Sequence, residues 1–248
     1  MAEYFARVAA IALVLSCGAA QAAPRPFASW AAVIVAGDHY DADDNPTEGF
    51  DNARRDVSRD LLRIGFSPAN LVQFSVTPRK YRTEKLLMTR PGAIGRALSR
   101  LTQRTSGGCL LYFSSHGAPD GLVVGDWIVP PRALAQTVDY SCGTRPTVVI
   151  ISACFSGAML PPLEAPNRMI LTAARRDRTS FGCGQTDRYP YFDQCVLQSW
   201  GVVADFPALG RKTRGCIAAR EKKEHLSPPS DPQLWIGAKA SASLPKWR

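Results

Sequence analysis

Six runs of apolar residues, each followed by small or polar residues, recur along the chain. They cover residues 31–36, 70–76, 109–113, 148–151, 168–174 and, more weakly, 233–237. Continuous apolar runs rich in β-branched residues are typical of strands buried on both faces, as in a parallel sheet covered by helices. We therefore predict a strand in each run.

The segments between these runs carry helical patterns. Residues 50–64 form an apolar stripe of helical spacing that ends at Gly65. A second helical region is expected over 83–103, with an interruption at Pro91-Gly92, and 123–135 has room for a hairpin and a short helix. Strands that alternate with helices predict an α/β fold, with a mostly parallel sheet of about six strands and helices on both faces.

The domain organisation follows from length and composition. The chain contains no internal repeat, and residues 23–248 are enough for a single domain with a full core. An apolar content of 46% and a charged content of 21% are typical of a soluble globular protein. The Pro-, Ser- and Lys-rich residues 239–248 predict a loose tail.

Two of the predicted strands end next to side chains that can react. Cys154 follows the run 148–151, and His116 follows the run 109–113. Parallel strands joined by a right-handed crossover bring their carboxyl ends to one edge of the sheet, where open α/β sheets bind ligands. A cysteine after an apolar run is more often a packing residue. Its match with a histidine in the same kind of position favours a nucleophile with its base.

The residues around these two positions resemble a known pair of motifs. The sequences YFSSHG at 112–117 and ISACFSG at 151–157 are similar to those of the caspase-like cysteine peptidases, and within them of the legumain family of asparaginyl endopeptidases. The resemblance extends from about Trp30 to about Gly237 and implies a caspase-like three-layer sandwich. It also implies His116 as general base or proton shuttle, Cys154 as nucleophile, and an oxyanion hole from the backbone N–H groups of Gly117 and Cys154.

The function that the resemblance implies is that of a bacterial secreted cysteine endopeptidase. It would cleave peptide or protein substrates through a Cys-His dyad and an acyl-enzyme intermediate, without a cofactor. Two alternatives stand beside it: a transpeptidase at the same site, with an amine in place of water, and a non-catalytic caspase-like domain that binds peptides or regulates a partner. The presence of both reactive residues favours catalysis.

A third group that orients the histidine is not identified by the resemblance. Legumain-like enzymes carry an asparagine for this purpose after the first strand, where this sequence has Asp38 and His39. Either of them is a candidate for the role, and His39 is equally well interpreted as an ordinary loop residue.

Several positions resemble parts of the family's substrate-binding site. Asp56 lies in a helix segment similar to the one that lines the family's specificity pocket, although a surface ion pair is the commoner fate of such a charge. Thr179 and Ser180 resemble the family's substrate-binding strand, and Asp193 lies near its acidic pocket residue. Ser152 replaces the acid that legumains carry two residues before the nucleophile. Asn specificity is therefore not implied, and a pocket for Lys or Arg and one for small residues remain equally open.

The charge of the protein does not indicate a particular class of binding partner. The formal net charge is +9, and the basic residues form short scattered clusters without interleaved aromatic residues. A nucleic-acid platform needs such aromatic residues for base stacking, so we expect no specific nucleic-acid partner. The oligomeric state is not indicated by the sequence.

The N-terminus predicts export. Residues 1–22 combine a short apolar core with the small-x-small sequence Ala20-Gln21-Ala22, which is typical of a cleaved signal peptide. The apolar stretch is shorter than the ~20 residues of a membrane span. We expect a secreted or periplasmic protein, with lipoprotein anchoring at Cys17 as a minor alternative and no transmembrane span.

Six cysteines remain after removal of this leader, and export permits disulfides. With Cys154 free, at least one more cysteine should be unpaired. Cys109 and Cys142 each precede a central strand and are expected to lie close together, and Cys183 has Cys195 and Cys216 as possible partners. No Cys/His pattern has zinc spacing, so no metal is predicted.

Overall fold

The computed structural model describes residues 25–248, and its centre is a seven-stranded sheet. The strand order is β10-β9-β8-β4-β1-β2-β3, and every neighbouring pair is parallel except β9 with β10. The strands are β1 (Ala31–Ala36), β2 (Leu71–Ser75), β3 (Leu86–Met88), β4 (Cys109–Ser114), β8 (Thr147–Ser152), β9 (Arg168–Thr172) and β10 (Gln233–Ile236). The mostly parallel α/β sheet expected from the sequence is confirmed.

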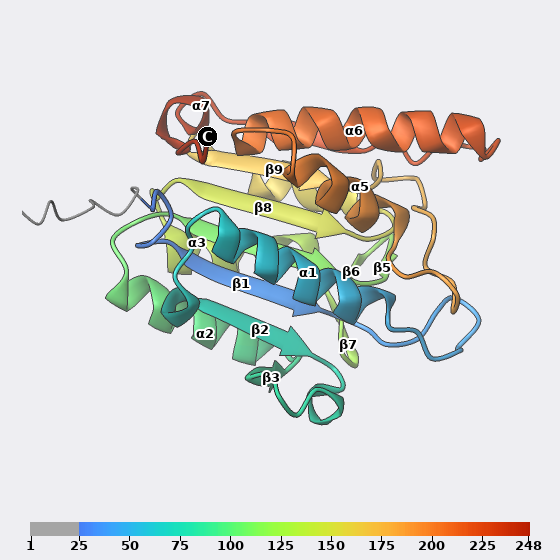
Figure 1. The fold of residues 1–248 in the computed structure, drawn as a ribbon, viewed down its shortest axis with the longest axis horizontal. Helices are drawn as coiled ribbons and strands as arrows, with labels where there is room; N and C mark the ends of the chain where they lie inside the picture. Colours follow the sequence, from blue (N-terminus) through green and yellow to red (C-terminus); the bar gives the residue numbers. More distant parts are fainter. Residues whose placement is uncertain (1–24) are drawn as a thin grey trace, which may run out of the picture.

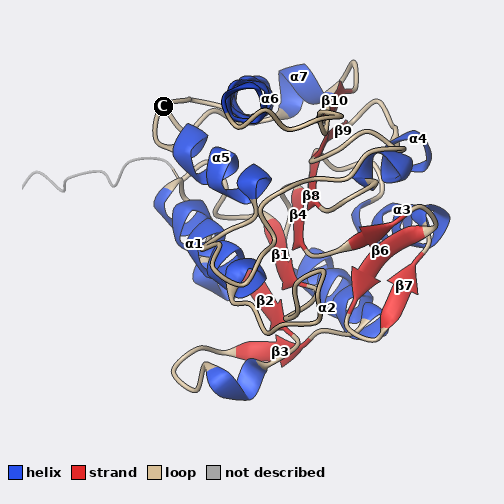
Figure 2. Cartoon of the chain, turned by 90° about the vertical axis from the view of Figure 1, so that its right-hand side faces the viewer, coloured by secondary structure: helices blue, strands red, loops and turns tan. Residues whose placement is uncertain are grey.

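Helices cover both faces of this sheet, which gives three layers (Figures 1 and 2). One face carries α1 (Gly49–Arg63), α5 (Tyr191–Trp200) and α6 (Phe206–Lys223). The other carries α2 (Pro91–Arg104), α3 (Pro131–Cys142) and the short α4 (Leu160–Leu163), while α7 (Ala240–Ser243) lies near the C-terminus. Three short 3₁₀ turns span Pro68–Asn70, Pro78–Lys80 and Ser156–Met159.

The core is divided into two parts by the sheet. In β1, Ala32 and Ile34 pack toward α1 and α5, whereas Val33 and Val35 pack toward α2 and α3, and all of them are fully buried. Successive side chains of a strand point to opposite faces, so a strand covered on both sides has no position left for a polar residue. This explains why the central runs of the sequence are continuously apolar.

A small second sheet lies next to the carboxyl end of β4. It consists of β5 (Gly117–Ala118), β6 (Gly121–Val124) and β7 (Trp127–Val129), in antiparallel order β5-β6-β7. The β6–β7 hairpin and the following α3 are the hairpin and helix expected over 123–135. β5 begins directly after His116, so the small sheet fixes the direction in which the chain leaves that residue.

The edge of the sheet differs from the prediction. Residues 83–90 are not helical: they include the strand β3, and α2 starts only at Pro91. Proline favours the first position of a helix because its fixed backbone angle suits the helix and its missing N–H has no role there. The interruption seen in the sequence is therefore the beginning of the helix, and β3 is the additional strand.

The C-terminal residues are packed against the domain, in contrast to the expected loose tail. The Trp247 ring lies against Phe206 and Trp200, with ring centroids 5.1 and 6.2 Å away, and the backbone N–H of Trp247 donates to the Ala204 carbonyl at 2.9 Å. Leu244 is also buried. These apolar side chains anchor a segment whose overall composition is typical of a tail.

Two disulfides join elements on the two faces. Cys109 at the start of β4 pairs with Cys142 at the end of α3, as expected. Cys195 of α5 pairs with Cys216 of α6, so the proposed pairing of Cys183 with either of them is wrong. Cys154 and Cys183 are the free cysteines among residues 25–248, which confirms that a second thiol is unpaired. None of the helices in this range is long and apolar enough to cross a membrane.

The central position of β4 gives a test of the fold. Leu111 is fully buried in β4, whereas Leu87 in the edge strand β3 is 48% exposed. Leu111→Ala should lower the free energy of unfolding by about 2–5 kcal/mol, because it removes buried methyl groups and leaves a cavity. Leu87→Ala should change it by only about 0.5 kcal/mol. Urea unfolding measures both, and equal losses in the two variants would contradict this strand order.

Candidate active site

The strands that lead to His116 and Cys154 are direct neighbours. β4 and β8 are paired in parallel, with Ser114 opposite Ser152 as the last residue of each strand. The Ser115 N–H continues the pairing by donating to the Ser152 carbonyl at 3.0 Å. His116 is two positions after Ser114, and Cys154 is two positions after Ser152. Both therefore lie at the edge where the parallel strands end, which is on the right in Figure 1.

Gly117 lies against the backbone of Cys154. A Cβ atom at Gly117 would be 2.1 Å from the Cys154 carbonyl oxygen, so only glycine fits at this position. The Val123 N–H donates to the His116 carbonyl, which makes residues 116 and 123 a hydrogen-bonded pair of the antiparallel β5–β6 ladder. The next pair, Gly117 with Leu122, is then a non-hydrogen-bonded one, and the Gly117 N–H is directed away from β6.

The sulfur of Cys154 lies next to a segment from the β9–α5 connection. The Ser180 N–H donates to Cys154 Sγ at 3.2 Å, and the Phe155 N–H donates to the Arg178 carbonyl at 2.8 Å. Phe155 has a φ of +55°, a left-handed conformation that is uncommon for a bulky residue. The chain therefore turns sharply directly after Cys154 and is fixed there by the adjacent segment.

The imidazole of His116 is held by a backbone carbonyl and an aromatic ring. His116 Nε2 lies 2.9 Å from the Tyr40 carbonyl oxygen, and the Phe50 ring packs edge-on against the imidazole with centroids 5.0 Å apart. A carbonyl only accepts hydrogen bonds, so the proton of a neutral imidazole is placed on Nε2 in this arrangement. Nδ1 is left as the basic nitrogen.

Asp38 and His39 lie beside this interaction but do not make it. The Asp38 carboxylate accepts the N–H groups of His39, at 2.6 Å, and of Tyr40, at 3.1 Å. The His39 ring packs on the Tyr40 ring with centroids 4.0 Å apart. Both residues shape the turn that presents the Tyr40 carbonyl. Sequence reasoning missed this contact with His116, because a backbone carbonyl is present in every residue and carries no signal in the sequence.

Asp56 is buried in α1 and ties down the β9–α5 connection. It is 2% exposed, accepts a hydrogen bond from the Tyr189 hydroxyl and forms an ion pair of 2.8 Å with Arg59. The Asn52 amide reinforces the contact by donating to the Arg188 carbonyl at 3.1 Å. Asp56 is thus a tether for the connection that carries Thr179 and Ser180. Of those two, Ser180 contacts Cys154, and Thr179 is exposed.

Asp193 and Ser152 lie beneath the strand ends without exposure to solvent. Asp193 is fully buried, and its carboxylate accepts hydrogen bonds from the hydroxyls of Tyr112, Ser114 (2.7 Å) and Ser152 (2.9 Å). Burial raises the pKa of Asp193 to about 7, although the three hydroxyl donors act in the opposite direction. In this structure neither Asp193 nor Ser152 presents a polar atom on an open pocket wall.

The second free thiol, Cys183, is on the same connection as Ser180. Burial raises the pKa of Cys183 far above its usual range, and the charges of Cys154 and Asp193 add to the effect. A thiol with a raised pKa remains protonated and is a weak nucleophile. The environment of Cys183 therefore disfavours its thiolate form.

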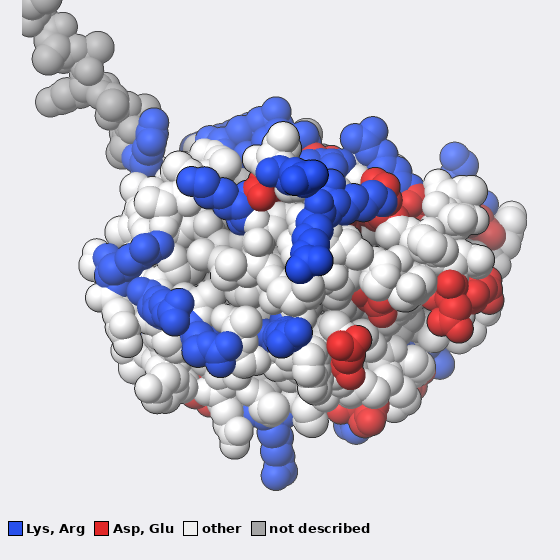
Figure 3. Space-filling model, turned by 90° about the horizontal axis from the view of Figure 1, so that it is seen from below, with Lys and Arg blue, Asp and Glu red and all other residues white. Residues whose placement is uncertain are grey.

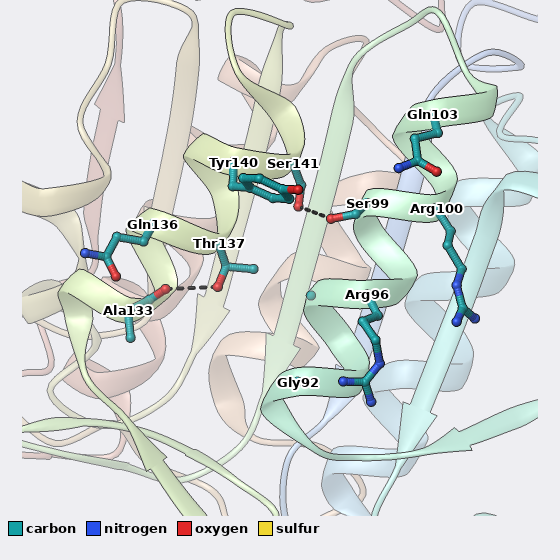
Figure 4. A pocket seen from close by; sticks show the side chains of 11 residues that line it. Gly92, Arg96, Ser99, Arg100, Gln103, Ala133, Gln136, Thr137, Tyr140 and Ser141 are labelled. Carbon is teal, nitrogen blue, oxygen red and sulfur yellow. Dashed lines mark hydrogen bonds between the residues drawn. The ribbon is translucent and has the colours of Figure 1, made fainter.

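A well-defined hollow lies elsewhere on the molecule. It has a volume of about 770 Å³ and lies between α2 and α3, lined by residues such as Arg96, Arg100 and Tyr140 (Figure 4). Neither His116 nor Cys154 takes part in its lining. His116 and Cys154 are both half-buried and lie at the edge where the parallel strands end, not in this hollow.

Surface charge is unevenly distributed. Seen from below, Lys and Arg side chains are spread over the left, the middle and the top of the molecule, and Asp and Glu side chains gather on the right, toward the end where the parallel strands finish (Figure 3). The segment 38–48, which follows the carboxyl end of β1, contains five acidic residues: Asp38, Asp41, Asp43, Asp44 and Glu48. No group of His, Cys, Asp and Glu side chains within residues 25–248 has the arrangement of a metal site.

Comparisons with known proteins show one family and one fold. The profile of the Peptidase C13 family matches residues 31–213. No curated protein matches the chain. Among solved structures, the crystal structure of Caspase-1 from Spodoptera frugiperda is similar, with a TM-score of 0.59 and 16% identity over 85% of this chain and 90% of that chain. At this identity the similarity shows the fold alone, which is caspase-like.

The raised pKa of Asp193 predicts a pH dependence of stability. The folded state binds a proton that the unfolded state has released between about pH 4 and pH 7, so this group's contribution to stability falls as pH rises through that range, by up to ~1.4 kcal/mol per pH unit. Asp193→Asn lacks the contribution. Urea unfolding of the wild type and of Asp193→Asn from pH 4 to pH 8 should show that the difference between their free energies of unfolding changes steadily with pH. A constant difference would contradict the buried, proton-binding carboxyl.

Proposed function

The chain belongs to the peptidase C13 family, which makes it a cysteine peptidase, and from this membership we propose an endopeptidase with Cys154 as nucleophile and His116 as its proton-transfer partner. The observation that carries the proposal is the in-register pairing of β4 with β8, because it brings both residues to one edge of the sheet. Cys183, the other free cysteine, is disfavoured by its raised pKa.

The orientation of His116 suits general-base chemistry. With the proton of Nε2 directed at the Tyr40 carbonyl, Nδ1 is free to take the thiol proton of Cys154. The sulfur then attacks the peptide carbonyl carbon, and His116 returns the proton to the leaving amine as the C–N bond breaks. Water, deprotonated by the same nitrogen, attacks the resulting thioester and releases the acid product and the free thiol.

Two backbone N–H groups are suited to stabilise the oxyanion of the tetrahedral intermediate. The Gly117 N–H is directed away from β6, and its backbone lies against that of Cys154. Cys154 N–H has no hydrogen-bond acceptor among residues 25–248. Donors fixed near a developing negative charge are each worth about 10²–10³ in rate, and glycine allows the substrate carbonyl to approach closely.

The connection from β9 to α5 supplies a surface for an extended substrate. Ser180 contacts the sulfur through its N–H, Thr179 is exposed beside it, and Asp56 ties the far part of the connection to α1. A peptide added as a strand along this segment would place one of its carbonyl groups above Cys154. The substrate class of the proposal is therefore an extended or unfolded peptide segment.

Export to an oxidising compartment is part of the proposal. The predicted signal peptide, residues 1–22, and Cys17 lie outside the described residues. Support comes from the two disulfides, since such bonds persist mainly in secreted and periplasmic proteins. Expression of the full chain in a bacterial host should yield a mature protein in the periplasm or medium that begins at about residue 23. N-terminal sequencing measures this, and an intact Met1 on the accumulated protein would contradict export.

Covalent labelling tests the proposed nucleophile. A peptide carrying an acyloxymethyl ketone should label the wild type at Cys154, and Cys154→Ala should abolish both labelling and cleavage of a peptide library. Cys183→Ala is the matched control, because it removes the other free thiol and should retain both. His116→Ala should lower kcat by at least about 10²-fold with the fold retained. Labelling at Cys183, or full cleavage by Cys154→Ala, would refute the assignment.

A further inference from the structure

One buried carboxylate joins the two strands that carry His116 and Cys154. Asp193 Oδ2 accepts both the Ser114 hydroxyl of β4 and the Ser152 hydroxyl of β8, and Oδ1 accepts the Tyr112 hydroxyl. Ser114 and Ser152 are directly opposite each other in the ladder. The single oxygen Oδ2 therefore bridges the last residues of the two strands.

We propose that Asp193 is a positioning residue: through Ser114 and Ser152 it fixes the ends of β4 and β8, and thereby the relative placement of His116 and Cys154. The proposal rests on the roles given to these two residues in the proposed function. It assigns Asp193 no contact with substrate, which distinguishes it from an acid in a specificity pocket.

The strand ends are the place where such a bridge has an effect. Upstream, both strands are held on either side by parallel neighbours and covered by helices. Downstream of Ser114 and Ser152 the regular strand pairing ends. The two chains are still in contact through the Ser115 N–H and Gly117, but one continues into β5 and the other into the sharp turn at Phe155. A single residue separates each bridging serine from the reacting residue (Ser115 before His116, Ala153 before Cys154), so a shift of a strand end also moves the reacting side chain. A displacement of ~1 Å in a reacting group costs up to about 10² in rate.

In its ionised form, which predominates above its pKa of about 7, Asp193 satisfies all three hydroxyls of the cluster. Three hydroxyls without exposure to solvent need acceptors, because a buried unsatisfied polar group is costly. A carboxylate offers acceptor sites on both oxygens and no donor, whereas an amide has a single acceptor oxygen and two donors of its own. An asparagine of the same size would leave one serine without its present partner or force a hydroxyl to reverse.

Asp193 is itself held rigidly enough to position other groups. It lies in the first turn of α5, two residues before Cys195, and the disulfide from Cys195 to Cys216 ties α5 to α6. The neighbouring side chains Phe192, Cys195 and Val196 are buried in the core on this face of the sheet. The carboxylate is thus fixed to a packed helix layer, and the strand ends are fixed to the carboxylate.

The cluster contains its own control. Tyr112 donates to the same carboxylate, but through Oδ1, and it lies in the body of β4 opposite Ile150 rather than at the strand end. Tyr112→Phe removes one hydroxyl from Asp193, as Ser114→Ala and Ser152→Ala do. A cluster that only stabilised the fold would respond similarly to all three changes.

The test combines turnover with a readout that needs no turnover. For Ser114→Ala, Ser152→Ala, Asp193→Asn and Tyr112→Phe, kcat and KM are measured on one peptide substrate, together with the rate of Cys154 alkylation by iodoacetamide and the urea midpoint. We expect kcat to fall about tenfold or more in the two serine variants and in Asp193→Asn, with KM changed less than about twofold. Alkylation of Cys154 should slow in the same three variants. Tyr112→Phe should stay within about twofold of the wild type in both rates.

The double variant Ser114→Ala/Ser152→Ala sharpens the result. Because both serines act through one oxygen, its loss of kcat should be clearly smaller than the product of the two single losses. Equal rate losses in Tyr112→Phe and the serine variants, in proportion to their lower urea midpoints, would reduce the cluster to a stabilising role and overturn the proposal. A raised KM or a changed residue preference in Asp193→Asn at constant kcat would make Asp193 a substrate-binding residue and also overturn it.

Failure of the proposed endopeptidase function would give a different result from failure of the positioning role. If the wild type cleaves no peptide, the assignment of an endopeptidase falls, and the alkylation rates alone then decide on Asp193. Slower Cys154 alkylation in Ser114→Ala and Ser152→Ala than in Tyr112→Phe supports the positioning role even then. Equal alkylation rates in all variants refute it.

Discussion

The parallel pairing of β4 with β8, in register up to their last residues, is the constraint on which the rest of the site depends. It places the Cys154 thiol, the His116 imidazole and the backbone of Gly117 at one edge of the sheet, although Cys154 is about 40 positions away from the other two in the chain. The register is strongly specified, because a slip of one residue would turn the apolar side chains of these strands out of their core layers. The geometry of the site is thus a consequence of how the central sheet packs.

Two buried polar clusters hold the elements around the site in place. Asp193 joins the strand ends from the α5 side. On the α1 side, the fully buried Arg54 forms ion pairs with Asp51 and Glu84, both at 2.7 Å, and holds the first turns of the helix against the β2 edge. That turn carries Phe50, which packs on the His116 ring. Burying charged groups is costly unless they are paired, so such clusters are more readily explained by geometry than by net stability.

The sequence was most informative where packing and chemistry coincide. Continuous apolar runs predicted the central strands. The small and reactive residues after 109–113 and 148–151 indicated His116, Gly117 and Cys154 as candidates, and the strands that lead to them end at one edge of the sheet. The half-exposed edge strand β3 was missed because Leu86–Met88 is only three residues long and was assigned to the helical region over 83–103. The tail was misjudged because a few anchors, such as Trp247, outweigh a polar composition. The groups that orient the side chains of the site could not be predicted from the sequence. A backbone carbonyl such as that of Tyr40 is present in every residue, and the identity of Asp193 does not indicate which hydroxyls surround it in the fold.

A crystal structure of the protein with a peptide aldehyde bound to Cys154 tests the central claim most directly. The pairing of β4 with β8 predicts a thiohemiacetal on Cys154 whose oxygen lies within hydrogen-bond distance, roughly 2.7–3.1 Å, of the Gly117 N–H, with the His116 imidazole beside the sulfur and its Nε2 still on the Tyr40 carbonyl. An adduct whose oxygen points away from Gly117, or an imidazole turned away from the sulfur, would contradict it.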